Sequence, residues 1–156
     1  MKLYLVRHGD AVPEQQAGSD RDRWLSQRGR EAVRVLSRLL REAGVQPDAI
    51  VSSPLPRAVQ TAELVAASLD HLHVITTLYC LEPTSFPHVA APAIQKAGAS
   101  VLVVGHEPSI SGLGAHLLGR PSFPQFRTAQ CYAIEDAKPT FTARPDIAQV
   151  QAYFVD

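Results

Sequence analysis

The sequence predicts an α/β domain, a three-layer α/β/α sandwich in which helices cover both faces of a mostly parallel central sheet. Short apolar runs alternate with longer amphipathic stretches along the chain, a pattern typical of parallel strands joined by helical crossovers. The runs are continuously apolar, as in strands that are buried on both faces. Because the 156 residues are 46% hydrophobic, enough for one core, we expect residues 1–156 to form a single domain.

The first half of the chain supplies two strands and two helices. A strand is expected at residues 3–6, and a polar loop at 14–23 follows it. Ser26 is a candidate N-cap of a helix whose apolar residues recur at three- and four-residue steps, and Gly44 is its expected stop. A second strand at 49–51 leads to a second helix that carries Arg57 in its first turn.

The second half repeats the alternation and then changes character. A third strand is expected at 73–77, a weaker helix at 89–97 that Pro92 interrupts, a fourth strand at 100–104 and a helix at 109–118. Two β-like runs, near 129–134 and 150–155, are separated by turn residues that include Pro139 and Pro145. We interpret these runs as late or edge strands. The short connections leave little or no room for a cap inserted over the sheet.

Composition and charge exclude several classes of function. The 15 basic and 15 acidic residues cancel, so no global positive field attracts nucleic acid or an acidic membrane. No apolar run approaches the roughly 18 residues of a membrane helix, and the N-terminus lacks the apolar region of a signal peptide. Cys80 and Cys131 lie too far apart for a CxxC unit, which argues against a disulfide framework or a cysteine zinc site. We expect a cytoplasmic monomer.

Polar side chains follow three of the predicted strands at the point where each strand ends. They are Arg7 and His8 after the first strand, Ser52 and Ser53 with nearby Arg57 after the second, and His106 after the fourth. Ligands of open parallel sheets bind beyond the carboxyl ends of the strands. If these strands are neighbours, two guanidinium groups and two imidazoles meet in one cleft.

This combination predicts a site for a phosphoryl group. Two arginines that face one pocket repel each other unless an anion lies between them, and the planar guanidinium fork suits phosphate. The N-termini of the helices near Arg57 and Ser109 would add backbone N–H groups. Nearby positive charge favours a neutral imidazole, whose lone pair can attack phosphorus and form a phosphohistidine intermediate. Gly9 is expected to let the backbone approach the phosphate.

Four blocks of sequence resemble, in order, those of the histidine phosphatase superfamily, which is also called the phosphoglycerate mutase-like family. Residues 5–9 (LVRHG) resemble its Arg-His-Gly signature, and residues 25–29 (LSQRG) its Leu-Thr-x-x-Gly helix start. Residues 52–62 (SSPLPRAVQTA) resemble its Ser-Ser-x-x-x-Arg-x-x-Gln-Thr-Ala block, and residues 103–106 (VVGH) its Val-x-Gly-His block. The resemblance extends from residue 3 to about residue 118.

The resemblance implies a role for each matching residue. His8 is the nucleophile that becomes phosphorylated, while Arg7, Arg57 and His106 bind the phosphoryl oxygens, and no metal or other cofactor is needed. Gly9 and Ser52 are the further candidates for substrate binding. The family usually has a carboxylate after the third strand that protonates the leaving group. Glu82 is the nearest candidate, although Cys80 stands where such a glutamate would align, and a surface carboxylate before a proline is the alternative.

The small size, the sequence RHGDA and the short loops resemble the SixA-type phosphohistidine phosphatases. An open cleft would admit a phosphorylated side chain of another protein, whereas small substrates gain affinity from enclosure. We therefore hypothesise removal of a phosphoryl group from phosphohistidine on a signalling or phosphotransfer protein.

Three alternatives stay open. One is a small-molecule phosphomonoesterase that acts on a sugar phosphate, a nucleoside phosphate or a cofactor precursor, and another is a phosphoryl-binding module without turnover. The third is a metal hydrolase whose ligands would be His8, Asp10, His106 and Glu107. Arg7 and Arg57 would oppose the binding of a cation there.

Overall fold

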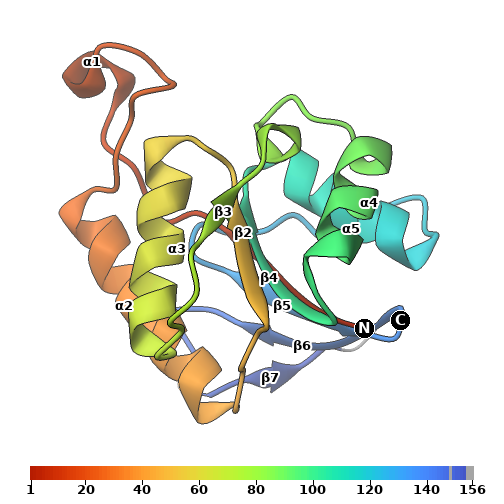
Figure 1. The fold of residues 1–156 in the computed structure, drawn as a ribbon. Coiled ribbons are helices and arrows are strands. Elements are labelled where there is room, and N and C mark those ends of the chain that lie inside the picture. Colours follow the sequence, from red (N-terminus) through yellow and green to blue (C-terminus); the bar gives the residue numbers. More distant parts are fainter. Residues whose placement is uncertain (148, 154–156) are drawn as a thin grey trace.

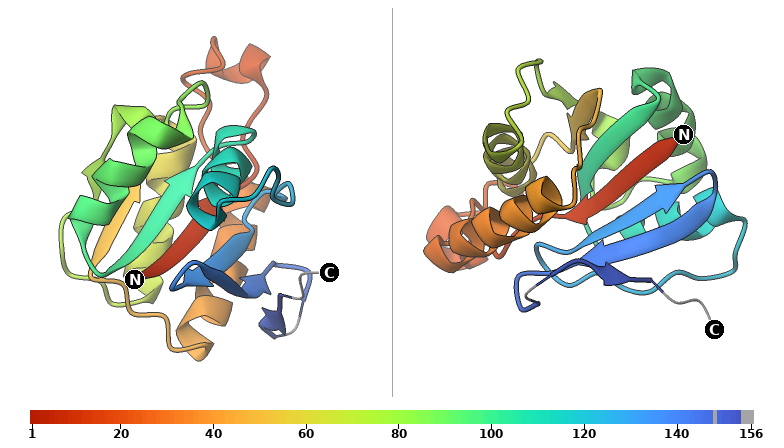
Figure 2. Two further views of the ribbon diagram at one scale, coloured as in Figure 1. Left: turned by 90° about the vertical axis from the view of Figure 1, so that its right-hand side faces the viewer. Right: turned by 90° about the horizontal axis from the view of Figure 1, so that it is seen from below.

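A computed structural model describes residues 1–147 and 149–153. One sheet contains β1 Lys2–Arg7, β2 Ala49–Ser52, β3 Thr76–Thr77, β4 Ser100–Gly105, β5 Cys131–Glu135, β6 Lys138–Ala143 and β7 Gln151–Ala152. The strand order is β3-β2-β4-β1-β5-β6-β7. The four strands β1 to β4 are parallel, and β5, β6 and β7 extend the sheet beyond β1 in antiparallel pairs (Figure 2).

Helices cover both faces of this sheet, so the predicted α/β/α class is confirmed (Figure 1). They are α1 Glu14–Ala17, α2 Gln27–Glu42, α3 Pro56–Ser68, α4 Pro87–Ala97 and α5 Ser109–Leu118, with a 3-10 turn η1 at Tyr79–Leu81. Figure 1 shows α2 and α3 on one face and α4 and α5 on the other. Within the described residues, no helix is both long and apolar enough to cross a bilayer.

Alternate residues of the central strands bury their side chains in two different cores. Val6 of β1 and Leu102 of β4 pack in the core beneath α2 and α3. Leu5 and Val103, their neighbours along the same strands, pack in the core beneath α4 and α5. Burial on both faces explains why these strands are continuously apolar in sequence.

Strand register brings the carboxyl ends of three strands to one edge of the sheet. Arg7 at the end of β1 pairs with Gly105 at the end of β4, and Ser52 at the end of β2 pairs with Val104. The residues that follow β1, β2 and β4 therefore emerge side by side. The polar positions predicted from separate parts of the sequence share this edge because β4 lies between β2 and β1.

The ends of α2 agree with their sequence signals. The Ser26 hydroxyl accepts a hydrogen bond from the Gly29 backbone N–H at 2.9 Å, as an N-cap does. After the helix, Gly44 has a φ of +74°, in the left-handed region that favours glycine. Both predicted boundaries are confirmed.

Three elements differ from the predicted ranges. The third strand contains only Thr76–Thr77, because Val74 is exposed and the preceding residues form no ladder. Helix α4 begins at Pro87, whose fixed φ suits a first helical position, and continues through Pro92. Burial of Ala90 and Ile94 holds that helix to the sheet despite the missing N–H. The polar loop at 14–23 contains the short helix α1.

The turn predicted around Pro139 is wrong, because this segment is strand β6. Pro139 pairs with Ile134 beside a register shift at 133/134, and a proline is tolerated in a sheet at such an irregularity. The first predicted late run is shorter than expected and begins at Cys131. The second is described only as β7, Gln151–Ala152, and its residues 154 and 155 lie outside the described residues.

Candidate active site

A cavity of about 330 Å³ opens at the edge where β1, β2 and β4 end. It is lined by Arg7, His8, Asp10, Ala11, Asp20, Arg23, Arg57, Pro83, His106, Glu107 and Thr128. Four residues that were predicted from separate strand ends, Arg7, His8, Arg57 and His106, are thus brought together. The loop that carries Asp20 and Arg23 forms another side of the same cavity.

His8 follows β1 directly, and only 8% of its surface is exposed. Its Nδ1 lies 2.6 Å from the carbonyl oxygen of Gly9. Because a carbonyl oxygen can only accept, Nδ1 carries the proton, and the neutral ring keeps a lone pair on Nε2. Burial lowers the pKa of His8 to about 4, and the positive charges of Arg57 and Arg7 act in the same direction. At neutral pH the imidazole is therefore unprotonated at Nε2.

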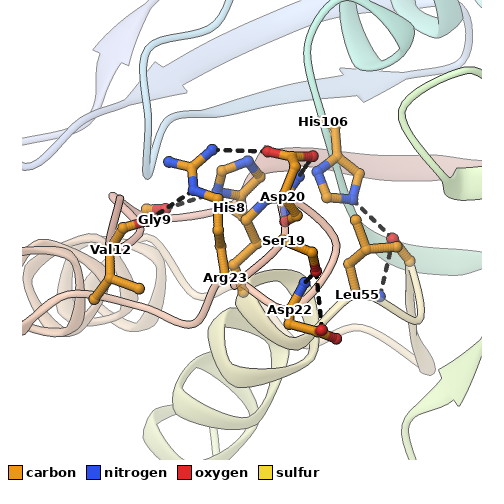
Figure 3. A network of polar contacts seen from close by, with 11 residues as sticks. His8, Gly9, Val12, Ser19, Asp20, Asp22, Arg23, Leu55 and His106 are labelled. Carbon is orange, nitrogen blue, oxygen red and sulfur yellow. Dashed lines mark hydrogen bonds and ion pairs between the residues drawn. The ribbon is translucent and has the colours of Figure 1, made fainter. Parts of the chain in front are cut away.

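His106 lies beside His8, and the ring centroids are 4.9 Å apart. Its Nε2 is 2.8 Å from the Ser53 hydroxyl, which also accepts the Leu55 N–H at 3.3 Å (Figure 3). A Ser53 hydroxyl that donates to Nε2 leaves the ring proton on Nδ1. Burial lowers the pKa of His106 to about 3, with smaller contributions from His8 and Arg57. This ring is also neutral at physiological pH.

Two arginines supply the positive charge of the cavity. Arg57 lies in the first turn of α3 and is 4% exposed, and Arg7 ends β1, where its Nη1 donates to the Phe126 carbonyl at 2.9 Å. Within the described part of the chain, Arg7 Nε, Arg57 Nε and His106 Nδ1 are buried without a hydrogen-bond partner. Buried donors of this kind are costly unless an acceptor meets them. An oxyanion supplies such acceptors.

Gly9 and Ser52 lie outside the lining of the cavity. A Cβ atom on Gly9 would stand 2.7 Å from Val33 Cγ2, so close packing against α2 requires a glycine here. The Gly9 N–H donates to Thr61 Oγ1 at 3.1 Å. Ser52 is fully buried, and its hydroxyl donates to the Ser53 carbonyl at 2.9 Å. It is the neighbouring Ser53 that contacts a cavity histidine.

Glu82 follows η1 and lies at the rim. Its Oε1 is 3.0 Å from Arg21 Nη2, and the next residue, Pro83, lines the cavity. The side chain of Glu82 is 23% exposed and that of Arg21 is 58% exposed. The carboxylate thus lies near the cavity but is held in an ion pair that faces solvent.

Sequence reasoning missed the loop residues that reach the cavity. Asp20 accepts hydrogen bonds from both Arg57 and Arg23, and Thr128 approaches from the segment before β5. The charged composition of residues 14–23 marked this loop as polar, but no periodicity indicated where it folds. Only the fold places residue 20 against residue 57.

The donor set fits an anion better than a metal ion. Within residues 1–147 and 149–153, no group of three or more His, Cys, Asp or Glu side chains is placed to hold a metal. The buried Arg57, the partly buried Arg7 and two neutral imidazoles instead surround a space that suits a tetrahedral oxyanion. A neutral imidazole with a free Nε2 can act there as a nucleophile towards phosphorus.

Known proteins resemble this chain in sequence. The model of the histidine phosphatase superfamily (branch 1) matches residues 3–81. The phosphohistidine phosphatase SixA of Escherichia coli K12 is 31% identical over 133 residues, which cover 83% of this chain and 81% of that protein. The chain therefore belongs to the histidine phosphatase superfamily.

Other relatives resemble parts of the chain or its fold. An uncharacterised protein of Picosynechococcus is 38% identical over 68 residues, and the match spans 44% of this chain and 41% of that protein's length. The structure of SixA complexed with tungstate has a TM-score of 0.84 at 27% identity and covers 93% of this chain and 97% of its own. A phosphoserine phosphatase of Entamoeba histolytica shares the fold, with a TM-score of 0.68 at 15% identity and coverage of 93% and 96%.

Proposed function

We propose that the protein is a phosphatase that removes phosphoryl groups from phosphohistidine on another protein, through a phosphohistidine intermediate on its own His8. The observation that carries this proposal is the buried, neutral His8, whose free Nε2 shares one cavity with Arg7, Arg57 and His106. The similarity to SixA along most of the chain supports it, as does the tungstate in the SixA structure, because tungstate is a tetrahedral oxyanion like phosphate.

In the first step, His8 Nε2 attacks phosphorus, and the bond between phosphorus and the leaving group breaks. The bonding electrons go to the leaving group, which takes up a proton. Arg7, Arg57 and His106 hold the three remaining phosphoryl oxygens and stabilise their charge in the transition state. The Nδ1–H bond to the Gly9 carbonyl keeps the ring oriented and stabilises the positive charge that develops on it.

In the second step, water attacks phosphorus of the phosphohistidine and the bond between Nε2 and phosphorus breaks. Phosphate leaves with the water oxygen and one water proton, while the other proton returns to the carboxylate that protonated the leaving group. The electrons of the broken bond between Nε2 and phosphorus return to Nε2, so the neutral ring is restored. Burial favours this outcome because it disfavours a charged imidazole in the free enzyme.

Glu82 is the proposed proton donor to the leaving group. The next residue, Pro83, lines the cavity, and this neighbourhood supports the proposal. Phosphohistidine makes a smaller demand on such a donor than a phosphate ester does, because its P–N bond is already labile. The solvent-facing ion pair with Arg21 is compatible with this modest role.

The proposed partner is a phosphotransfer protein of cytoplasmic signalling, which the enzyme meets as a monomer. Because 15 basic and 15 acidic residues cancel, recognition falls to the surface around the cavity rather than to a global field. Light scattering after size exclusion should give a mass near 16.9 kDa. A mass of twice that value at assay concentration would contradict the monomer.

A small-molecule phosphomonoesterase is the second candidate. The cavity volume of about 330 Å³ falls at the lower end of the range of about 300–1,000 Å³ found for small-ligand pockets. Sugar phosphates, nucleoside phosphates and phosphorylated cofactor precursors are the substrates that this reading implies.

The decisive experiment compares wild type and His8→Ala on three substrates: a phosphohistidine protein, phosphoserine and a sugar phosphate. We expect the phosphohistidine protein to have the highest kcat/KM and the variant to lose turnover on all three. A strong preference for an ester would favour the second candidate. An acid-labile, alkali-stable label on His8 from labelled substrate distinguishes an enzyme from a module that only binds phosphoryl groups, and its absence would contradict the mechanism.

A further inference from the structure

An anionic side chain of the protein itself, that of Asp20, lines the oxyanion cavity and pairs with one of its arginines. The backbone carbonyl of Asp20 accepts a hydrogen bond from Arg57 Nη1 at 2.7 Å. The carboxylate oxygen Oδ2 of Asp20 lies 3.3 Å from Arg57 Nη2. The other carboxylate oxygen, Oδ1, is 3.0 Å from Arg23 Nη1. Asp20 therefore engages both terminal nitrogens of Arg57, the more deeply buried of the cavity arginines Arg7 and Arg57.

The two partners of this contact differ in how firmly they are held. The Arg57 side chain is 5% exposed and belongs to helix α3, whereas the Asp20 side chain is 56% exposed and lies on the loop between α1 and α2. Figure 1 shows α1 and its flanking segments projecting from the body of the fold. Loop segments of this kind open more readily than packed helices do. The cation is thus fixed, and the carboxylate is the partner that can move.

Carboxylates and phosphoryl groups compete for the same donors. Both present negatively charged oxygens to the fork of an arginine, in similar geometry. The hydrogen bond from Arg23, together with the charge of Arg57, holds the pKa of Asp20 below its ordinary value, so the group is a carboxylate at neutral pH. An oxyanion that binds Arg57 through its terminal nitrogens must displace Asp20 or accept its repulsion.

We propose that Asp20 is a specificity-determining residue, an internal competitor for Arg57 that weakens the binding of free phosphate and small phosphate esters. This inference rests on the proposed function, since it takes the cavity as the phosphoryl site. A phosphoryl group carried on a protein brings further contacts around the cavity that offset the displacement of Asp20. A small ester or the product phosphate brings few such contacts, so the site disfavours them.

Orthophosphate titrations by calorimetry test the proposal without need of turnover. We expect Asp20→Asn and Asp20→Ala to bind orthophosphate about three- to tenfold more tightly than wild type, as loss of a partly exposed ion pair allows. Asp20→Glu keeps the charge and should stay within about threefold of wild type. Thermal unfolding of each variant shows that the cavity tested is folded.

Asp22→Asn is the matched control, because Asp22 lies on the same loop and its carboxylate bonds to Ser19 rather than to a cavity arginine. It removes the same charge, and we expect its orthophosphate Kd to stay within about twofold of wild type. Unchanged or weaker binding in the Asp20 variants would overturn the proposal. Equal tightening in Asp22→Asn would also overturn it, since a general charge effect would then suffice.

Steady-state kinetics supply a second readout. Relative to wild type, Asp20→Asn should lower KM for a small phosphate ester more than KM for a phosphohistidine protein, and should strengthen inhibition by orthophosphate. An equal change in both KM values would contradict a role in specificity. If wild type shows no His8-dependent turnover, the proposed function fails, while the calorimetric titration still decides whether Asp20 competes with oxyanions.

Discussion

The inner wall and the outer rim of the cavity are built in different ways. The inner wall contains His8, Arg57 and His106, all less than a tenth exposed and positioned by strand ends and the first turn of a helix. The rim contains Asp20 and Glu82, which lie on connecting segments. Glu82 pairs with the exposed Arg21, whereas Asp20 pairs with Arg23 and with Arg57 of the wall. Groups on the wall are fixed and desolvated, whereas groups on the rim are partly hydrated.

This difference predicts that the wall carries out the reaction and that the rim influences which substrates bind. Desolvation keeps the imidazoles neutral and makes a guanidinium N–H without a partner costly. The wall therefore lowers the pKa values of the histidines and can stabilise the charge of a transition state. Ion pairs at the rim are screened by solvent and contribute little to stability. Substitutions in the wall should therefore change rates by orders of magnitude, and those at the rim by small factors.

The largest effect is expected for His8→Ala. Without Nε2 no covalent intermediate forms, and turnover of a phosphohistidine protein should fall by at least about 10³-fold. Circular dichroism should show an unchanged fold, because the substitution removes a buried polar ring from the cavity edge. His88→Ala removes an exposed histidine on α4 and should keep full activity. Residual turnover above a tenth of wild type in His8→Ala would contradict the mechanism.

Arg57→Lys tests the wall without removing its charge. A lysine ammonium cannot reproduce the planar fork, so kcat should fall by about 10²-fold. Single-turnover rates measure this loss separately from product release. Arg34→Lys, on the exposed face of α2, is the control and should match wild type. Equal activity of Arg57→Lys and wild type would mean that a point charge suffices at this position.

The wall also predicts how stability depends on pH. The pKa values of His8 and His106 are lowered to about 4 and about 3, against an ordinary value of 6.5 in the unfolded chain. As pH falls below 6.5, the unfolded chain takes up protons that the folded protein does not, so the contribution present above pH 6.5 is progressively lost. Between pH 7 and pH 5, protonation of each histidine in the unfolded chain should lower the free energy of unfolding by about 2 kcal/mol.

Denaturant unfolding at pH 7 and pH 5 measures this loss, and His8→Ala should reduce it by about half. His88→Ala serves again as the control and should leave the pH dependence unchanged. Turnover should show no step near pH 6.5, because folded His8 is already neutral there. A wild-type stability that stays constant between these pH values would contradict the lowered pKa values.

The smallest effect is expected at the rim. Glu82→Gln should lower kcat about tenfold for a phosphate ester, whose leaving group needs a proton, but less than about threefold for phosphohistidine. Arg21→Gln breaks the same ion pair and keeps the carboxylate, so it separates loss of the proton donor from loss of the pair. Equal losses on both substrates in Glu82→Gln would contradict the assignment as a proton donor.

Local sequence patterns indicated most of the layered fold. The runs at 3–6 and 100–104 identified the central strands because burial on both faces leaves continuous apolar residues. Ser26 and Gly44 identified the limits of α2 because capping depends on neighbouring residues. Strand β6 escaped detection because its proline is tolerated only through an irregular pairing with β5, and pairing is not a local property.

The sequence by itself determined which residues end the strands, and hence which arginines and histidines could meet at one edge of a parallel sheet. Only the tertiary structure decided that β4 lies between β2 and β1, that the Gly9 carbonyl fixes the proton on His8 Nδ1, and that Asp20 reaches Arg57. Secondary structure follows from neighbours along the chain. The site depends instead on contacts between residues far apart in sequence, and their geometry is set by packing and desolvation.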